Sequence, residues 1–272
     1  MIVDCHTHLN LGADEVQTSE HLEAAEKVDA CIVLAGPDDS SDAVNKRLSE
    51  YVTKHSEKMI GFAVVEPRQD NIGTKNLTSI RDKLGLMGTV LYCSRRGLHP
   101  THSRAMQFYE SAEKLGLPVF FHNGGALGAD AILEYAQPHL LDEVARRFPA
   151  LKIVIGTMGL PFTEQTLALV AKHDNVYADL TIRPSNVWQV YNIVVSAHEY
   201  GVMDKLLFGS GYPQANAGQC METLLGFNKL LADTNLPTVP RVDIQGIIER
   251  DTLELLGIRS GAYPLPQAPS VR

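Results

Sequence analysis

The chain opens with the stretch Ile2-Val3-Asp4-Cys5-His6-Thr7-His8-Leu9, a short apolar run that ends in two histidines. Because a β-strand alternates its side chains between two faces, His6 and His8 at a strand end project to the same side and can hold one cation. Imidazole is the commonest protein ligand for zinc and suits several other divalent metals. A histidine pair hydrogen-bonded near a strand end is the alternative, since such a pair arises easily by chance in a chain with ten histidines.

Apolar, β-branched runs like the first recur along the chain, with amphipathic helical stretches between them. This alternation is typical of parallel β-α units. The runs predict eight strands, at residues 1–5, 30–35, 60–65, 87–92, 119–121, 152–155, 176–179 and 205–208. The helix candidates cover residues 19–27, 42–55, 104–115, 140–148, 164–173, 184–200, 220–231 and 243–256.

Eight such units in 272 residues predict an α/β fold, the closed (β/α)8 or TIM barrel. An open doubly wound sheet usually has fewer strands and a glycine-rich G-x-G-x-x-G turn after the first, and residues 1–5 are followed by no such turn. We therefore expect a single barrel domain over residues 1–258. Residues 259–272 contain three prolines and no periodicity, which predicts a C-terminal tail.

The composition favours a small-molecule ligand. A formal charge of -8 and a pI near 5.7 argue against nucleic acid or an anionic membrane as the main partner. No run of eighteen apolar residues and no basic, apolar leader is present, and the four cysteines are scattered without C-x-x-C spacing. We expect a cytoplasmic protein with reduced thiols, and the pattern leaves a homo-oligomer open.

A third histidine follows the fifth predicted strand, in Leu117-Pro118-Val119-Phe120-Phe121-His122. In a (β/α)8 barrel the carboxyl ends of all strands meet at one rim, where the chemistry is located. His6, His8 and His122 are therefore predicted to bind one divalent metal ion, with zinc as the first expectation and manganese as the second. Three imidazoles and a water complete a tetrahedral zinc site. A hydrogen-bonded histidine at a strand end is the alternative for His122.

Four motifs together carry a family resemblance. They are Asp4-Cys5-His6-Thr7-His8, the approach Glu113-Lys114-Leu115-Gly116-Leu117-Pro118 to His122, Phe148-Pro149-Ala150-Leu151-Lys152-Ile153-Val154, and Leu206-Leu207-Phe208-Gly209-Ser210-Gly211-Tyr212-Pro213. With them, nearly the whole chain resembles the metal-dependent amidohydrolase superfamily, in the branch called amidohydrolase 2. The resemblance implies a barrel with one zinc or manganese ion bound by the first-strand pair, the fifth-strand histidine and an aspartate closing strand eight. It also implies hydrolysis of amides, esters or lactones, or decarboxylation or hydration of small acids.

The sequence departs from this family pattern at two positions. Thr157 stands where a sixth-strand histidine usually assists the chemistry, and Gly211 stands where the eighth-strand aspartate is expected. Threonine does not shuttle protons near neutral pH, and glycine offers neither a ligand nor a base. Asp179 and Glu66, at the ends of strands seven and three, are the candidate catalytic replacements. The alternatives are helix or turn capping for Asp179 and a rim salt bridge for Glu66.

The loop after strand four concentrates basic side chains in an otherwise acidic protein. Arg95, Arg96 and His99 are predicted to bind a substrate carboxylate or phosphate, because guanidinium groups bind planar anions in bidentate fashion. A solvated loop paired with surface acids is the alternative. His102 in the same loop offers a further ligand or acid, and Thr157 and Tyr212 complete the predicted substrate-binding set.

Three functional hypotheses follow from the sequence. The first is a metal-dependent hydrolase that acts on a small, anionic carbonyl compound through a metal-activated water. The second, motivated by Thr157 and Gly211, is a catalytically degenerate barrel that binds or senses a small molecule. The third is a metal-independent, lactonase-like hydrolase in which histidines act as acid and base.

Overall fold

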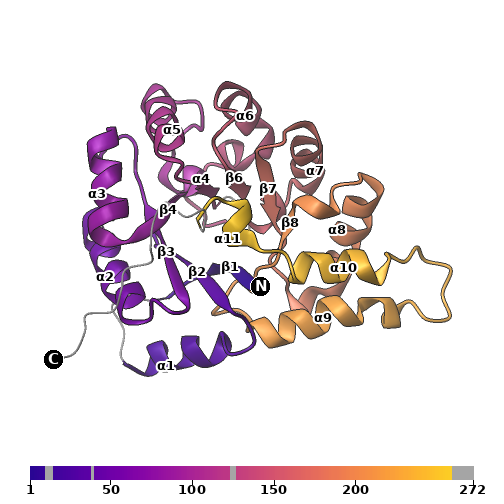
Figure 1. Ribbon diagram of the computed structural model, residues 1–272. Helices are drawn as coiled ribbons and strands as arrows, with labels where there is room; N and C mark the ends of the chain where they lie inside the picture. Colours follow the sequence, from indigo (N-terminus) through magenta and orange to yellow (C-terminus); the bar gives the residue numbers. More distant parts are fainter. Residues whose placement is uncertain (10–14, 38–39, 123–126, 259–272) are drawn as a thin grey trace.

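Eight parallel strands form the centre of the computed structural model, which describes residues 1–9, 15–37, 40–122 and 127–258 (Figure 1). They are paired in sequence order from β1 to β8. Their bounds are β1 Val3–Thr7, β2 Ala30–Leu34, β3 Met59–Val64, β4 Leu86–Leu91, β5 Val119–Phe121, β6 Ile153–Ile155, β7 Val176–Asp179 and β8 Leu206–Leu207. The predicted TIM barrel is therefore confirmed.

Backbone hydrogen bonds between β1 and the end of β8 bring the two edges of the sheet together. The N–H of Cys5 donates to Phe208 O at 2.9 Å, and the N–H of Gly211 donates to His6 O at the same distance. Further along, the N–H of His8 donates to Tyr212 O at 2.9 Å. A closed barrel leaves no free strand edge, and it places β1 between β2 and β8.

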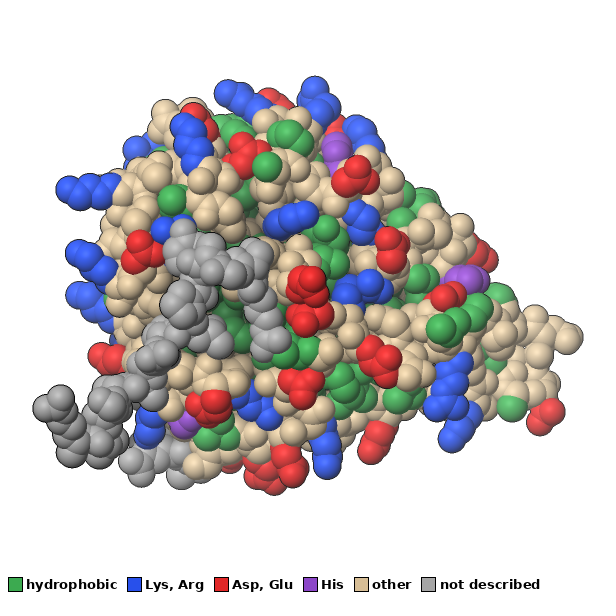
Figure 2. All heavy atoms as spheres, in the orientation of Figure 1, with side chains coloured by type: hydrophobic (Ala, Val, Ile, Leu, Met, Phe, Trp, Pro, Cys, Tyr) green, Lys and Arg blue, Asp and Glu red, His purple; other side chains and the backbone are tan. Residues whose placement is uncertain are grey.

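Helices surround the strands in the arrangement visible in Figure 1. Their bounds are α1 Glu15–Ala24, α2 Ser41–Lys54, α3 Thr74–Leu84, α4 Cys93–Arg96, α5 Ser103–Leu115, α6 Asp142–Arg147, α7 Thr163–Lys172, α8 Val187–Glu199, α9 Ala217–Leu230, α10 Arg241–Ile248 and α11 Thr252–Leu255. On the face drawn in Figure 2, acidic and basic side chains are intermixed. Among the described residues, no helix combines the length and the apolar character that crossing a membrane requires.

Several helical details differ from the sequence prediction, of which α3 and the last helix are the largest. Helix α3 was absent from the predicted set; it buries only Leu77 and Ile80, so its apolar stripe is too sparse to stand out. The prediction of a single last helix over residues 243–256 is wrong. The structure has two helices there, because α10 ends at Ile248 and α11 begins at Thr252. The Asp251 side chain accepts a hydrogen bond from the N–H of Glu254 and so caps the new helix. The predicted tail, 259–272, lies outside the described residues.

A ring packed over a glycine fills the barrel between β3 and β4. Gly61 faces outward, since a β-carbon built on it would meet Leu48 of α2, and its neighbour Phe62 therefore faces inward. Phe62 is fully buried and pairs with Gly88. A β-carbon at Gly88 would lie 2.5 to 2.6 Å from three atoms of the Phe62 ring. The barrel interior at this level therefore requires glycine.

We expect Gly88→Ala to lower the free energy of unfolding by ~1–3 kcal/mol, because the added methyl overpacks the Phe62 ring. Gly246→Ala is the matched control, since a β-carbon at this α10 position meets nothing within 4 Å. Alanine should stabilise that helix by ~0.5–1 kcal/mol. Urea unfolding of both variants measures the difference, and equal effects would contradict this account of the packing.

Candidate metal centre

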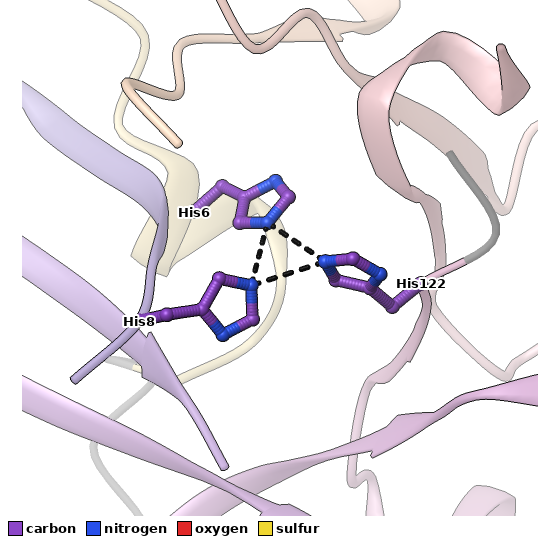
Figure 3. Close-up of side chains that lie close together, drawn as sticks. All are labelled: His6, His8 and His122. Atoms are coloured by element: carbon purple, nitrogen blue, oxygen red, sulfur yellow. Dashed lines mark hydrogen bonds between the residues drawn. The ribbon is translucent and has the colours of Figure 1, made fainter. Parts of the chain in front are cut away.

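The structure brings the three predicted histidines together at the carboxyl ends of β1 and β5 (Figure 3). The Nε2 atoms of His6 and His8 are 3.0 Å apart, those of His8 and His122 are 3.0 Å apart, and those of His6 and His122 are 3.2 Å apart. Three nitrogens at about 2.0–2.1 Å from one tetrahedral zinc ion would be separated by roughly 3.3 Å. The triangle is therefore close to the size that a metal requires.

Hydrogen bonds on the far side of two rings determine where their lone pairs point. Nδ1 of His6 lies 2.5 Å from Oδ2 of Asp179, and Nδ1 of His8 lies 3.2 Å from the carbonyl oxygen of Leu34. Carbonyl and carboxylate oxygens accept, so both Nδ1 atoms carry a proton, and in the neutral form of each ring Nε2 presents a lone pair. Two such lone pairs 3.0 Å apart repel one another unless a metal ion or a proton lies between them. The donor set therefore fits a divalent ion.

Asp179 is the buried carboxylate that orients His6. Its Oδ2 also accepts from the N–H of Thr157 at 3.0 Å and from the Thr181 hydroxyl, and its Oδ1 accepts from the N–H of Thr181 at 2.9 Å. Burial acts to raise the pKa of Asp179, but the charge and hydrogen bond of His6 and the bonds from Thr181 and Thr157 outweigh it, so the pKa lies below its usual value. An ionised partner of this kind fixes the tautomer of a metal-binding histidine.

Burial also keeps the other two rings neutral. It lowers the pKa of His8 from 6.5 to about 3, with a smaller electrostatic contribution from the neighbouring His6. It lowers the pKa of His122 well below the usual value, with further contributions from His6, His8 and Arg95. Neutral imidazole is the form that binds a metal.

A cavity of about 300 Å³ lies beside His122. Arg95 is among its lining residues and contributes positive charge. The lining residues that sequence reasoning missed include Tyr92 and Asp130. The Tyr92 ring lies 4.8 Å from that of His122, and its hydroxyl donates to Ala35 O at 2.8 Å. The position of Tyr92 at the end of β4 was the available signal for it.

The remaining basic residues of the β4 loop make other contacts. Arg96 donates to the carbonyl of Pro37. Nδ1 of His99 accepts from the N–H of Thr101 at 3.2 Å, and His102 accepts from the N–H of Arg104 as the N-cap of α5. Of the predicted anion-binding residues, Arg95 is therefore the one that lines the described cavity.

The other predicted site residues are placed as follows. Glu66 is buried, and its Oε1 accepts from both the N–H and Nε of Arg68, each at 3.3 Å. Thr157 is buried beside Asp179, with a left-handed φ of 50°. The half-buried Tyr212 ring lies 4.9 Å from that of His21. Glu66 and Tyr212 thus make contacts away from the lined cavity, whereas Thr157 supports the carboxylate that holds His6.

The amidohydrolase family model matches residues 3–236. The chain belongs to the amidohydrolase family. Among solved structures, the chain is similar to a probable 2-pyrone-4,6-dicarboxylic acid hydrolase from Acinetobacter baumannii with citric acid bound, at 16% identity and a TM-score of 0.66, over 94% of this chain and 99% of that one. It is similar to a 2,6-dihydroxybenzoate decarboxylase from Rhizobium, at 15% identity and a TM-score of 0.64, over 94% and 98%.

A third similar structure is a dihydroxybenzoic acid decarboxylase from Polaromonas sp. JS666 with bound manganese and the inhibitor 2-nitroresorcinol. The identity is 14% and the TM-score 0.62, over 94% of this chain and 97% of that one. The comparison with curated proteins found no match. At these identities the solved structures support the barrel fold, and the family match agrees with the resemblance carried by the sequence motifs.

Replacing the Asp179 carboxylate should weaken metal binding. Asp179→Asn places an amide NH2 against the N–H and hydroxyl donors that now meet a carboxylate oxygen. We expect divalent-metal affinity to fall ~10- to 100-fold, the usual effect of removing such a supporting group. Titration against a chromophoric chelator measures it. Asp142→Asn, which disrupts contacts with Lys172 and His173 elsewhere, is the control and should leave the affinity unchanged.

The metal-free protein should lose stability as the pH falls. His8, His122 and His21 have lowered pKa values in the folded state, so below about pH 6.5 the unfolded chain takes up protons that the folded chain does not. Each such group reduces the free energy of unfolding by ~1.4 kcal/mol per pH unit. Burial raises the pKa of Asp4 to about 6, so the folded chain takes up this one proton more readily than the unfolded chain. Asp4 therefore opposes the loss of stability, but the three histidines outnumber it.

Urea unfolding of chelator-treated protein between about pH 7.5 and 4.5 measures this slope. His8→Asn should make the slope shallower, because it removes one titrating group. His198→Asn, at a partly exposed surface ion pair with Asp243, should leave the slope nearly unchanged. A stability that does not change with pH in the parent protein would contradict the burial argument.

Proposed function

We propose that the chain is a metal-dependent hydrolase that binds one divalent ion with His6, His8 and His122 and acts on a small carboxylate compound. The observation that carries the proposal is the convergence of three Nε2 atoms, 3.0 to 3.2 Å apart, with two of their lone pairs directed by Asp179 and Leu34 O. The similar structures include one with bound citric acid and a dihydroxybenzoate decarboxylase, which supports a carboxylate substrate.

Zinc is the proposed ion, with manganese as the second choice. Imidazole nitrogen suits zinc, whereas manganese prefers carboxylate, carbonyl and water oxygens, and the cluster offers nitrogen alone. Manganese in the Polaromonas enzyme keeps the second choice open. When bound, such an ion would polarise a substrate oxygen and make a water molecule more acidic.

Arg95 is proposed to bind the substrate carboxylate in the cavity beside His122. A guanidinium pairs with a carboxylate through two parallel N–H bonds, which fixes orientation as well as affinity. The volume of about 300 Å³ suits a small molecule, and the Tyr92 ring offers an apolar wall for a planar one. Arg96 and His99 remain proposed contacts at the edge of this loop.

Proton transfer requires a group that the family positions at Thr157 and Gly211 do not supply. Asp179 and Glu66 are the predicted catalytic replacements, and Asp179 differs from Glu66 in that it contacts His6. Asp179 acts through His6, since its oxygens are occupied by five hydrogen-bonding groups. Asp130 is the carboxylate among the described lining residues of the cavity, and we add it as a proton-transfer candidate.

The catalytically degenerate binding barrel is the second candidate function, and the absence of side-chain acids or bases at Thr157 and Gly211 favours it. A metal-independent, lactonase-like hydrolase is the third. Turnover that persists after complete chelation would support the third candidate, and a bound ligand without turnover would support the second.

The proposal is tested on protein purified without chelator. We expect about one equivalent of metal by elemental analysis, and turnover of at least one member of a panel of carboxylate-bearing lactones, esters, amides and hydroxybenzoates. His122→Ala should lose the metal and reduce kcat/KM at least ~100-fold. Arg95→Gln should raise KM ~10-fold or more, in line with the loss of a charge-assisted hydrogen bond.

His198→Ala is the matched control, because this histidine contacts Asp243 at the surface. It should retain metal and activity. Absence of stoichiometric metal together with an unchanged melting temperature on adding zinc, manganese or cobalt would overturn the proposal.

A further inference from the structure

Left-handed backbone gathers where β6, β7 and β8 end beside His6. The φ angles are 50° at Thr157, 54° at Met158, 32° at Thr181 and 65° at Gly211. Positive φ is unfavourable for a β-branched residue, because its β-carbon crowds the backbone. Such strain persists where the surrounding structure enforces it, and it gathers at functional sites. Thr181 is also two residues beyond the carboxylate that orients His6.

We propose that Thr181 is a positioning residue of the histidine cluster, in which the hydroxyl sets His6 and the methyl group closes the strand-eight side of the site. The inference rests on the proposed function, since its consequence is a metal site committed to three histidines. The two groups of one side chain act separately, so they can be tested separately.

The hydroxyl joins His6 to Asp179. Oγ1 of Thr181 lies 2.9 Å from Nδ1 of His6 and donates to Oδ2 of Asp179. The N–H of the same residue donates to Oδ1 at 2.9 Å, so one residue holds both oxygens of the carboxylate. In its strained conformation Thr181 makes two hydrogen bonds to Asp179 and one contact with the His6 ring. Without the contacts from Thr181, Asp179 would be the only one of these two residues left to hold the Nδ1 side of the His6 ring.

The methyl group occupies the space beside Gly211. A β-carbon built on Gly211 would lie 2.7 Å from Cγ2 of Thr181, closer than real carbon contacts allow. The backbone of Gly211 cannot simply withdraw, because its N–H donates to His6 O at 2.9 Å. Any side chain at position 211, a carboxylate included, must therefore displace this methyl. Thr181 and Gly211 form a complementary pair that keeps strand eight from contributing a ligand.

The first experiment separates the hydroxyl from the methyl. Thr181→Ser keeps the hydroxyl, and Thr181→Val keeps the methyl. Cobalt(II) affinity, from competition with a chromophoric chelator, should fall ~10- to 100-fold in Thr181→Val and change by less than about threefold in Thr181→Ser. The visible cobalt spectrum should change in Thr181→Val alone, because an ill-oriented His6 alters the ligand geometry.

Thr89→Val is the matched control, since Thr89 is fully buried and donates to Pro118 O at 3.2 Å within β4. It loses a comparable hydroxyl and should bind cobalt as the parent does. Thr181→Ala, a smaller variant that also lacks the hydroxyl, should follow Thr181→Val and replaces it if valine prevents folding. Parent-like cobalt affinity in the hydroxyl-free variants, or an equal loss in Thr89→Val, would overturn the positioning role.

The second experiment needs no metal. Gly211→Ala should lower the melting temperature of metal-free protein in the parent background, and by clearly less when Thr181→Ser has removed the methyl. Equal losses in both backgrounds would overturn the packing claim. With Thr181→Ser, Gly211→Asp should bind cobalt at least ~10-fold more tightly than Gly211→Ala, whereas Gly211→Asp alone should not.

The outcomes separate the two proposals. A parent protein that binds no cobalt overturns the proposed function and the positioning role with it, and the melting comparison still decides the packing claim. A parent that binds cobalt, with variants that bind equally well, overturns the inference about Thr181 and leaves the proposed function standing.

Discussion

The arrangement of the candidate site depends on one constraint, which is that the Nε2 atoms of His6 and His8 face each other 3.0 Å apart. The acceptors behind the rings, Asp179 and the Leu34 carbonyl, impose this arrangement, since each leaves its histidine protonated at Nδ1. Barrel closure supplies those acceptors from both sides of β1. Leu34 ends the neighbouring strand β2, and Asp179 ends β7 across the short strand β8. The barrel topology therefore holds the two imidazoles close together, although their Nε2 lone pairs would repel one another in the absence of a cation.

The sequence predicted the architecture and the three histidines, because both follow from short-range rules. Eight β-branched runs define the strands, and parallel strands bring His6, His8 and His122 to one rim. What the sequence could not predict depends on long-range contacts. Helix α3 shows a sparse apolar stripe, and the break after α10 accompanies Arg250, whose Nε and Nη2 donate to Leu206 O and Met203 O at 3.0 Å. Likewise, Arg95 and Arg96 are adjacent in sequence, yet Arg95 lines the cavity while Arg96 donates to the Pro37 carbonyl.

Considered one at a time, Thr157 and Gly211 look like the loss of a catalytic histidine and of an aspartate ligand. In the structure both contribute to the surroundings of Asp179 and His6. The N–H of Thr157 donates to the carboxylate at 3.0 Å, and the N–H of Gly211 donates to His6 O at 2.9 Å. A residue that acts through its backbone N–H leaves no side-chain signature in the sequence. The role proposed for Thr181 depends on contacts with His6 and Gly211, which are far from it along the chain, so no local pattern indicated it. The two departures are therefore coupled to a third residue, and restoring either side chain alone meets a packed and hydrogen-bonded environment.

The charge of the proposed site bears on substrate class. The protein carries a formal charge of -8, which repels anions at long range. Beside His122 the balance differs, because three histidine ligands would leave the charge of a divalent ion uncompensated by any directly bound carboxylate, and Arg95 in the cavity adds a further positive charge. Asp179 lies behind His6, and Asp130 lines the cavity. Salt screens the long-range repulsion within about 10 Å at ordinary ionic strength, whereas a carboxylate inside the cavity is close enough to pair with the guanidinium. A three-histidine centre beside an arginine is therefore better matched to an anionic substrate than a centre with a carboxylate ligand would be.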